Sequence, residues 1–174
     1  MKKLIVYRTK YGSVKQYAEW LAEETGADLV PEKELKPAQL AEYDVLVFGG
    51  RLYAGRIQGL AKLKVALSRL KDKKILVFAV GAVPPEDNPA GELARRNFKD
   101  ASVLAAPLFV LPGKLMYSQL RRVDRMMVGM VSKMFSKKPE AERSPYENAL
   151  AGAKGRDLDM TDRSAVKPIA EAMQ

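Results

Sequence analysis

The sequence predicts a single α/β domain over residues 1–174, with a doubly wound, five-stranded parallel sheet and helices on both faces. Apolar runs alternate along the chain with segments in which apolar residues recur every three or four positions. Continuous apolar strands separated by helices are typical of a parallel sheet that is covered on both faces. Three of the expected strands also end in loops that contain glycine. In doubly wound sheets, ligands bind beyond the carboxyl ends of the strands, where the winding reverses.

Five apolar runs are the expected strands, and they cover residues 4–7, 27–30, 44–50, 74–81 and 103–111. Pro31 ends the second run. Pro107 lies inside the fifth run and predicts an edge position or a bulge, because proline cannot donate a hydrogen bond to a neighbouring strand.

Helical spacing marks three further segments. The first follows the first strand, the second follows the third strand, and the last ends the chain; their apolar faces are Val14, Tyr17, Ala18, Leu21 and Ala22, then Leu60, Leu63, Leu67 and Leu70, then Val166, Ile169, Ala170 and Met173. Thr161 and Asp162 are typical of a helix start. Because proline deep inside a helix is costly, the last helix either begins near Ser164, with Pro168 in its first turn, or is kinked.

Composition excludes several classes of chemistry. The chain has 174 residues, 47% of them apolar, and contains no cysteine and no histidine. Disulfides, thiolate metal sites, cysteine nucleophiles, the usual catalytic base and the commonest zinc ligand are therefore absent, and no metal site is expected. No apolar run approaches the roughly 20 residues of a membrane span, and the run after Lys3 is too short for a signal peptide. We expect a soluble cytoplasmic protein or one that is peripheral at the inner face of the membrane.

Residues 9–13 join the first strand to the first helix and are suited to bind an anion. Backbone N–H groups in such a turn converge on one point, and the positive end of the helix dipole adds to them. The hydroxyls of Thr9 and Ser13 can donate to the same oxygens, and Gly12 permits close approach. A single phosphate is the natural occupant, although the Walker and Gly-x-Gly-x-x-Gly patterns are missing. The alternative is an ordinary connection between a strand and a helix.

Three loops, at residues 9–13, 50–56 and 81–83, follow the first, third and fourth strands. With these loops in this order, the chain resembles the flavodoxin-like family. The resemblance implies that flavin mononucleotide (FMN) is the cofactor and that the first loop, followed by Val14, holds its phosphate. It also implies that the loops after the third and fourth strands hold the isoalloxazine ring. The implied cofactor-binding residues are Thr9, Lys10, Tyr11, Gly12, Ser13 and Val14 in the first loop, Gly50, Arg51, Leu52, Tyr53, Ala54, Gly55 and Arg56 in the second, and Gly81, Ala82 and Val83 in the third.

Residues 50–56 and the long basic insertion after the fifth strand are similar to the menaquinone-dependent protoporphyrinogen oxidase branch of this family. The electron carriers of the family are acidic, whereas this chain has 30 Lys and Arg against 21 Asp and Glu, a net charge of +9. Histidines that lie near the ring loop in the oxidase branch are absent here.

The resemblance gives the second loop its expected roles. Tyr53 is the best candidate to stack on the flavin ring or to lie at its edge. Arg51 and Arg56 flank it, and a guanidinium near the ring would stabilise reduced flavin and favour paired-electron transfer. The alternatives are that Tyr53 anchors the loop at the sheet edge and that the arginines are solvated surface charges.

Residues 112–138 carry seven basic residues and one acid, so +6 of the net +9 lies there. Between residues 115 and 135 the spacing predicts an amphipathic basic helix. Its apolar side is Met116, Leu120, Val123, Met127, Met130, Val131 and Met134, and its other side is Arg121, Arg122, Arg125, Ser132 and Lys133. Residues 136–159 show little periodicity and are predicted to form a mobile connector before the last helix, which makes the whole insertion about residues 112–160.

Three interpretations of the basic segment, residues 114–138, stay open. In the first, the helix packs on its own sheet and its basic face is exposed to solvent. In the second, it contacts an anionic membrane surface or a quinone. In the third, it binds a protein partner or a second copy of the chain. Nucleic acid is disfavoured, because exposed aromatics and a helix-turn-helix pattern are missing.

Two function classes lead, and the sequence assigns no catalytic residue to either. The first is an FMN-dependent oxidoreductase that takes electrons from a hydrophobic donor such as a porphyrinogen and passes them to a quinone. The alternative is a non-catalytic electron-transfer protein whose basic insertion docks an acidic partner. A third, weaker reading is a chain that has lost its flavin and serves as an interaction module.

Overall fold

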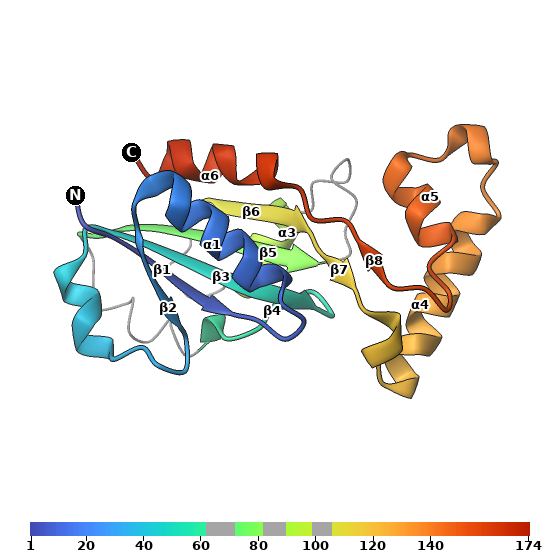
Figure 1. Cartoon of the computed structure of the whole chain (residues 1–174), viewed down its shortest axis with the longest axis horizontal. Helices are drawn as coiled ribbons and strands as arrows, with labels where there is room; N and C mark the ends of the chain where they lie inside the picture. The colour runs from blue at the N-terminus through green and yellow to red at the C-terminus, as the bar shows by residue number, and fades with distance from the viewer. Residues whose placement is uncertain (62–71, 82–89, 99–105) are drawn as a thin grey trace. The chain divides into compact units, whose positions relative to one another are not determined.

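The computed structural model describes residues 1–61, 72–81, 90–98 and 106–174 (Figure 1). These residues divide into two compact units. The sheet unit comprises Met1–Pro112 and Asp162–Gln174, and the insertion unit comprises Gly113–Thr161. The bounds of the insertion unit are within one residue of the predicted insertion, residues 112–160. That both units form a single domain stays a prediction.

The sheet unit contains five parallel strands in the order β2-β1-β3-β5-β6. Their bounds are β1 Lys3–Arg8, β2 Asp28–Pro31, β3 Val45–Tyr53, β5 Lys74–Gly81 and β6 Leu108–Pro112. The chain winds outward from β1 to β2, then crosses to the other side of β1 and winds through β3, β5 and β6. The predicted doubly wound fold is confirmed, and its winding reverses between β1 and β3.

Both faces of the sheet are apolar and both are covered. On one face, α1 (Ser13–Thr25) and α6 (Lys167–Ala172) pack over Ile5, Val47 and Phe78 (Figure 1). On the other face, the 3₁₀ helix η1 (Pro37–Glu42) and α3 (Ala90–Asn97) contribute to a cluster around Leu4, Val6 and Phe48. The predicted inner face of the first helix is confirmed, with Val14, Tyr17, Ala18 and Leu21 buried and Ala22 partly buried. Leu60 is buried, whereas Leu63, Leu67 and Leu70 lie outside the described residues.

The last strand begins later than predicted. Residues 103–105 lie outside the described residues, and β6 starts at Leu108, directly after Pro107. The strand lies at the edge of the sheet, as the proline predicted, and the Pro107 carbonyl accepts a hydrogen bond of 2.9 Å from the Val77 N–H. Proline is tolerated here because an edge strand needs partners on one side only.

The third strand, by contrast, runs further than predicted. We expected it to end at Gly50 and a loop to follow, but β3 continues to Tyr53 because Arg51 pairs with Val80 of β5. The chain then turns back as β4 (Arg56–Ile57), which pairs antiparallel with the end of β3. The predicted loop at residues 50–56 is therefore mostly a β-hairpin.

The C-terminal segment resolves the question raised by Pro168. The carboxylate of Asp162 accepts the Ser164 N–H at 2.8 Å and caps a 3₁₀ turn, η5 (Arg163–Val166). The α-helix α6 starts only at Lys167, so Pro168 lies in its first turn and no kink is needed. The predicted inner face is confirmed, with Val166, Ile169, Ala170 and Met173 buried.

A buried tyrosine joins the two points where the chain leaves and re-enters the sheet unit. The Tyr17 hydroxyl donates to the Pro112 carbonyl at 2.7 Å and accepts from the Asp162 N–H at 2.9 Å. Pro112 ends β6, and Asp162 precedes the last helical segment. The residues on either side of the insertion are thus tied to α1 through one side chain.

The insertion unit is built on two short strands and two α-helices. Its elements are β7 Lys114–Leu115, η3 Tyr117–Gln119, α4 Arg122–Ser136, η4 Glu140–Glu142, α5 Pro145–Ala151 and β8 Leu158–Asp159. The helix predicted from residue 115 starts only at Arg122, because Leu115 pairs with Leu158 across the β7–β8 ribbon. Within the described part of the chain, no helix has the length and apolar character needed to cross a membrane.

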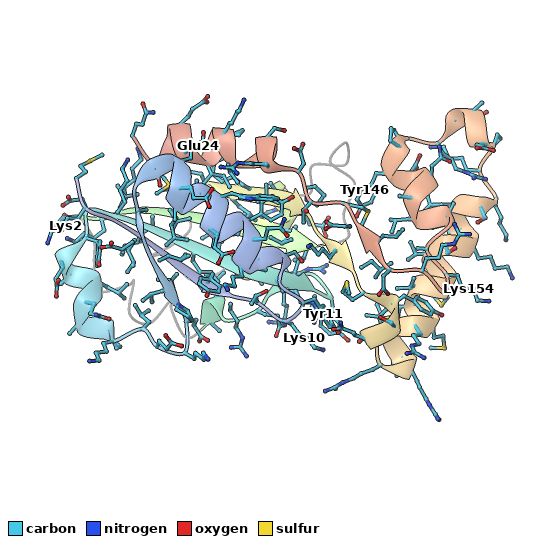
Figure 2. The ribbon with its side chains drawn as sticks, in the orientation of Figure 1. Lys2, Lys10, Tyr11, Glu24, Tyr146 and Lys154 are labelled. Carbon is cyan, nitrogen blue, oxygen red and sulfur yellow. The ribbon has the colours of Figure 1, made fainter. Side chains whose placement is uncertain are left out.

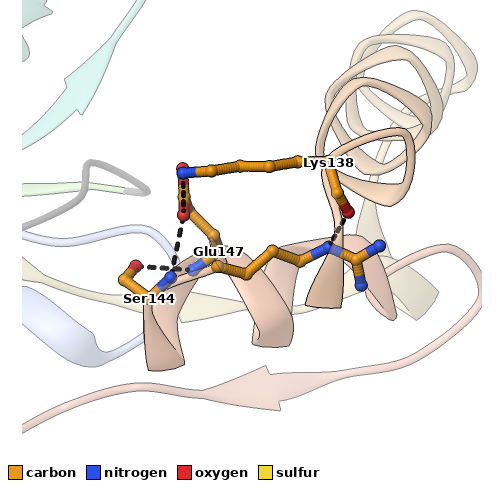
Figure 3. Close-up of polar contacts among 4 residues, drawn as sticks. Lys138, Ser144 and Glu147 are labelled. Atoms are coloured by element: carbon orange, nitrogen blue, oxygen red, sulfur yellow. Dashed lines mark hydrogen bonds and ion pairs between the residues drawn. The ribbon is translucent and has the colours of Figure 1, made fainter. Parts of the chain in front are cut away.

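The prediction of a mobile connector over residues 136–159 was wrong. Ser144 and Glu147 form a reciprocal capping box at the start of α5, and Pro145 occupies its first turn. Lys138 donates to both carboxylate oxygens of Glu147, at 3.1 and 2.9 Å (Figure 3). The capping signal was present in the sequence as Ser-Pro-Tyr-Glu. It was missed because the surrounding charged and small residues show no helical periodicity.

The capping carboxylate makes α5 sensitive to acid. The hydrogen bond from Lys138, followed by that from the Ser144 N–H, lowers the pKa of Glu147 below its ordinary value of 4.5. Because its pKa is lowered, the ionised Glu147 carboxylate stabilises the folded helix. This contribution is fully present above pH 4.5 and is lost as pH falls through the folded-state pKa. Hydrogen-exchange protection of the α5 amides should therefore drop in acid in the natural chain. In Glu147→Gln the drop should be smaller, whereas Glu142→Gln should behave as the natural chain does. Equal acid sensitivity in all three would contradict this assignment.

Candidate functional site

Three of the predicted segments meet at one edge of the sheet. In the parallel register, Arg8 of β1 lies beside Gly50 of β3, and Arg51 lies beside Val80 of β5. The loop after β1, the β3–β4 hairpin and Gly81 therefore adjoin at the carboxyl edge, where the winding reverses. Two of the predicted residues, Ala82 and Val83, lie outside the described residues.

The loop after β1 leaves the start of α1 open. Gly12 is the N-cap with φ 89° and ψ −24°, a left-handed conformation that favours glycine, and no side chain caps the helix. A Cβ built on Gly12 would meet no atom within 4 Å. The Gly12 N–H bonds to the Thr9 hydroxyl oxygen at 3.1 Å, and that hydroxyl keeps its own proton to donate. Ser13 and Val14 are buried, so Val14 serves the core. An open, uncapped helix start suits an anion.

Tyr11 places a hydroxyl without a partner in the same loop. Its Oη is buried and has no hydrogen-bond partner in the described part of the chain. Buried hydroxyls nearly always have a partner, so a ligand oxygen would satisfy this one. Figure 2 shows Tyr11 beside Lys10 at the carboxyl end of β1, and the Lys10 ammonium is 4.9 Å from the centre of the Tyr11 ring.

Arg51 joins the two loops. Its guanidinium carbon is 5.0 Å from the centre of the Tyr11 ring and 4.8 Å from that of the Tyr53 ring. Both distances are within the range of a cation–π contact. The sequence predicted these three residues for one site, and the structure brings them into contact. Arg51 is thus held between two aromatic rings rather than extended into water.

Tyr53 is the last residue of β3 and is 38% exposed. It lies opposite Arg56, which is also exposed, across a two-residue turn. Both turn residues have positive φ, 48° at Ala54 and 73° at Gly55. Such a turn suits a tight hairpin, but a left-handed alanine is strained by about 1 kcal/mol.

Packing explains the remaining predicted residues of the hairpin. A Cβ on Gly50 would lie 2.6 Å from the Ile57 side chain and 2.8 Å from the Gln58 carbonyl. A Cβ on Gly81 would lie 2.9 Å from Leu52. Gly50 thus lets the hairpin close, and Gly81 accommodates Leu52. That these residues also contact a cofactor stays a prediction.

Sequence reasoning missed Asn97, which fixes the hairpin from α3. Its amide nitrogen donates to the Gly55 carbonyl at 2.8 Å and to the Leu93 carbonyl at 2.9 Å, and its amide oxygen accepts the Ile57 N–H at 2.9 Å. The residue is 8% exposed. A single asparagine near the end of a helix gave no signal, because its two partners in the hairpin lie 40 and 42 residues earlier in the chain.

The chemistry at this edge is cationic and aromatic. Lys10, Arg51 and Arg56 carry its positive charge, and Tyr11 and Tyr53 supply the rings. Among the described residues, no group of three or more carboxylates could hold a metal ion. An open helix start beside aromatic and cationic side chains would suit a ligand that has one anionic end and one flat end.

The family comparison identifies the class of protein. A sequence profile described as "Flavodoxin domain" matches residues 4–142. The chain therefore belongs to the flavodoxin domain family, whose members are flavoproteins. No curated protein sequence matches it.

Solved structures with low sequence identity resemble the chain in part. A flavodoxin from the domain Archaea is 14% identical, with 64% of this chain and 83% of that chain covered and a TM-score of 0.46. A WrbA-like flavodoxin from Agrobacterium tumefaciens is 22% identical, with 63% and 82% covered and a TM-score of 0.44. The Trp repressor binding protein from Bacillus subtilis is 15% identical, with 64% and 85% covered and a TM-score of 0.48.

Replacing Asn97 should loosen the hairpin that carries Tyr53. Asn97→Ala leaves the Ile57 N–H and the Gly55 carbonyl without this partner in a buried setting, which should cost about 2–3 kcal/mol of stability in urea unfolding. Arg95→Ala changes an exposed residue of the same helix and should shift stability by less than about 0.5 kcal/mol. Equal stability of the two variants would show that Asn97 does not hold the hairpin.

Proposed function

We propose that the chain binds FMN at the carboxyl edge of β1, β3 and β5 and acts as an FMN-dependent oxidoreductase. The loop after β1 would hold the phosphate, and the β3–β4 hairpin would lie against the ring. Bound FMN supplies hydride and electron transfer. The residues of the chain supply placement and charge, which suits a sequence without cysteine or histidine.

The open start of α1 is the observation that carries this proposal. Gly12 leaves space where a side chain would stand, and no side chain caps the helix behind it. The Thr9 hydroxyl and the unpartnered Tyr11 hydroxyl lie in the same loop and can donate to phosphate oxygens. A flavin with a terminal phosphate monoester fits this set of donors better than riboflavin does.

Arg51 is the residue we expect to set the redox character of the site. Its position between Tyr11 and Tyr53 keeps a positive charge where the two loops adjoin. A positive charge beside the ring favours the reduced, anionic form of the cofactor and so favours paired-electron transfer. An acidic electron carrier would have the opposite bias.

For the substrates, we propose a hydrophobic donor of the porphyrinogen type and a quinone acceptor. The support is the similarity of residues 50–56 and of the basic insertion to the menaquinone-dependent protoporphyrinogen oxidase branch. A second candidate is a non-catalytic electron-transfer protein that docks an acidic partner, which the +6 charge of residues 112–138 favours. Turnover separates the two, since only the enzyme consumes a porphyrinogen with a soluble quinone analogue as the only acceptor.

Cofactor binding can be measured by titrating the purified protein with flavins and following absorbance and fluorescence. We expect FMN to bind at least 100-fold more tightly than riboflavin, because only FMN places a phosphate against the open helix start. Gly12→Val should abolish this preference, since a β-branched residue is disfavoured at φ 89° and would fill the cradle. A protein that stays colourless in excess FMN would overturn the proposal.

The charge of Arg51 can be tested by redox titration of the FMN-loaded protein. Arg51→Met should lower the two-electron midpoint potential by about 30 mV, which corresponds to losing about 1.4 kcal/mol of stabilisation of the reduced form. Arg51→Lys keeps the charge and should restore most of the potential. Arg95→Met is the matched control on α3. A potential that is unchanged in Arg51→Met would remove this residue from the redox role.

A further inference from the structure

The outer face of α4 is apolar and exposed. Among the described residues, the large apolar side chains that stand exposed are Met1, Tyr53 and six residues of this helix. The six are between 38% and 65% exposed, and they are Val123, Met126, Met127, Met130, Val131 and Met134. Their spacing of three and four residues places them on one continuous stripe of a helix about 22 Å long. We call this stripe the outer face of α4.

The orientation of α4 within the insertion unit is fixed by its opposite side. Ser132 is the buried residue of the helix, and its hydroxyl donates to the Ala151 carbonyl of α5 at 2.6 Å. The end of α4 is tied to α5 again, because Lys138 pairs with Glu147 at 2.9 Å and Arg143 donates to the Lys138 carbonyl at 2.7 Å (Figure 3). The sequence pattern had predicted Ser132 on the polar, solvent-exposed side of the helix. The helix therefore turns Ser132 inward, with Val128 and Phe135 partly buried, and its methionine-rich stripe outward.

Basic residues border the outer face. By helical geometry, Arg122 lies one turn before Met126, Lys133 lies one turn after Met130, and Lys137 lies one turn beyond Lys133 along the same edge. All three basic residues are exposed, and none has an ion-pair partner within the part of the chain that the structure describes. Lys114 and Lys138 are instead paired with Asp159 and Glu147, each at 2.9 Å. Three basic residues without an ion-pair partner in the described part of the chain thus lie beside the apolar stripe.

We propose that α4 lies in the surface of an anionic lipid bilayer, with its outer face among the acyl chains and Arg122, Lys133 and Lys137 at the phosphate headgroups. A convex apolar stripe bordered by cations matches an interfacial helix, whose apolar face enters the boundary of headgroups and acyl chains. Methionine side chains are flexible and adapt to disordered lipid. The same stripe on a second copy would bring like charges together, which disfavours self-association.

This proposal does not depend on flavin binding, and it is tested with vesicles. Flotation of the full chain should show binding to vesicles of phosphatidylcholine and phosphatidylglycerol at 7:3, and little binding to phosphatidylcholine alone. Raising the salt concentration from 0.1 to 1 M should weaken the binding, because it screens the headgroup charges. Absence of binding to the anionic vesicles would overturn the proposal.

Two pairs of variants separate charge from apolar contact. Lys133→Gln with Lys137→Gln should lower the partition coefficient about 30-fold, since each basic residue near anionic lipid contributes about fivefold. Lys33→Gln with Lys36→Gln removes the same charge from the sheet unit and should change binding by less than twofold. Met126→Ser with Met130→Ser should lower binding at least tenfold, whereas Met126→Leu with Met130→Leu should retain it. Circular dichroism of each variant checks that the helices are intact.

Two further outcomes would also overturn the assignment. The first is binding that is equally weak in both lysine pairs, which would mean that total charge rather than this edge attracts the vesicle. The second is a stable dimer in light scattering that the methionine-to-serine pair abolishes, which would identify the outer face as a contact between copies of the chain.

Discussion

The candidate site depends on the pairing of β1 with β3. These strands are neighbours in the sheet although β2 lies between them in the sequence, and their register runs from Lys3 beside Val45 to Arg8 beside Gly50. The reversal of winding at this pair leaves the loop after β1 and the hairpin after β3 side by side. The hydroxyl groups of residues 9–13 and the side chains of Arg51 and Tyr53, which come from segments about 40 residues apart, therefore share one edge.

The sequence predicted the sheet well because burial on both faces leaves a signal that needs no tertiary information. Leu4, Ile5 and Val6 are all buried although they alternate between the two faces of the sheet, so the strand appears as an unbroken apolar run. The end of β3 does not show this continuous apolar pattern. Residues 51–53 are held by pairing with β4 and β5 rather than by burial of a continuous apolar run, so they were predicted as a loop.

Periodicity also predicted an amphipathic helix in the insertion, but it could not predict which side faces inward. A methionine-rich side normally packs against the protein, whereas here a serine does so, because its hydroxyl reaches the Ala151 carbonyl of α5. The partner helix was itself missed. In the site, the loop of residues 9–13 was predicted from local turn chemistry, and the stacking of Arg51 between two tyrosines was not, because a contact between distant loops leaves no local pattern. The contacts of Asn97 with the hairpin were missed for the same reason.

Tyr17 gives the fold a modular character. Its hydroxyl holds the carbonyl at the end of β6 and the amide that precedes the last helical segment, so the polypeptide departs and returns at nearly one place. The entropy of closing a loop grows only slowly with its length. Residues between these anchors can thus be lengthened, shortened or exchanged over evolutionary time with little strain on the sheet. Relatives with the same sheet could in this way acquire different attachments to their surroundings without rebuilding the core.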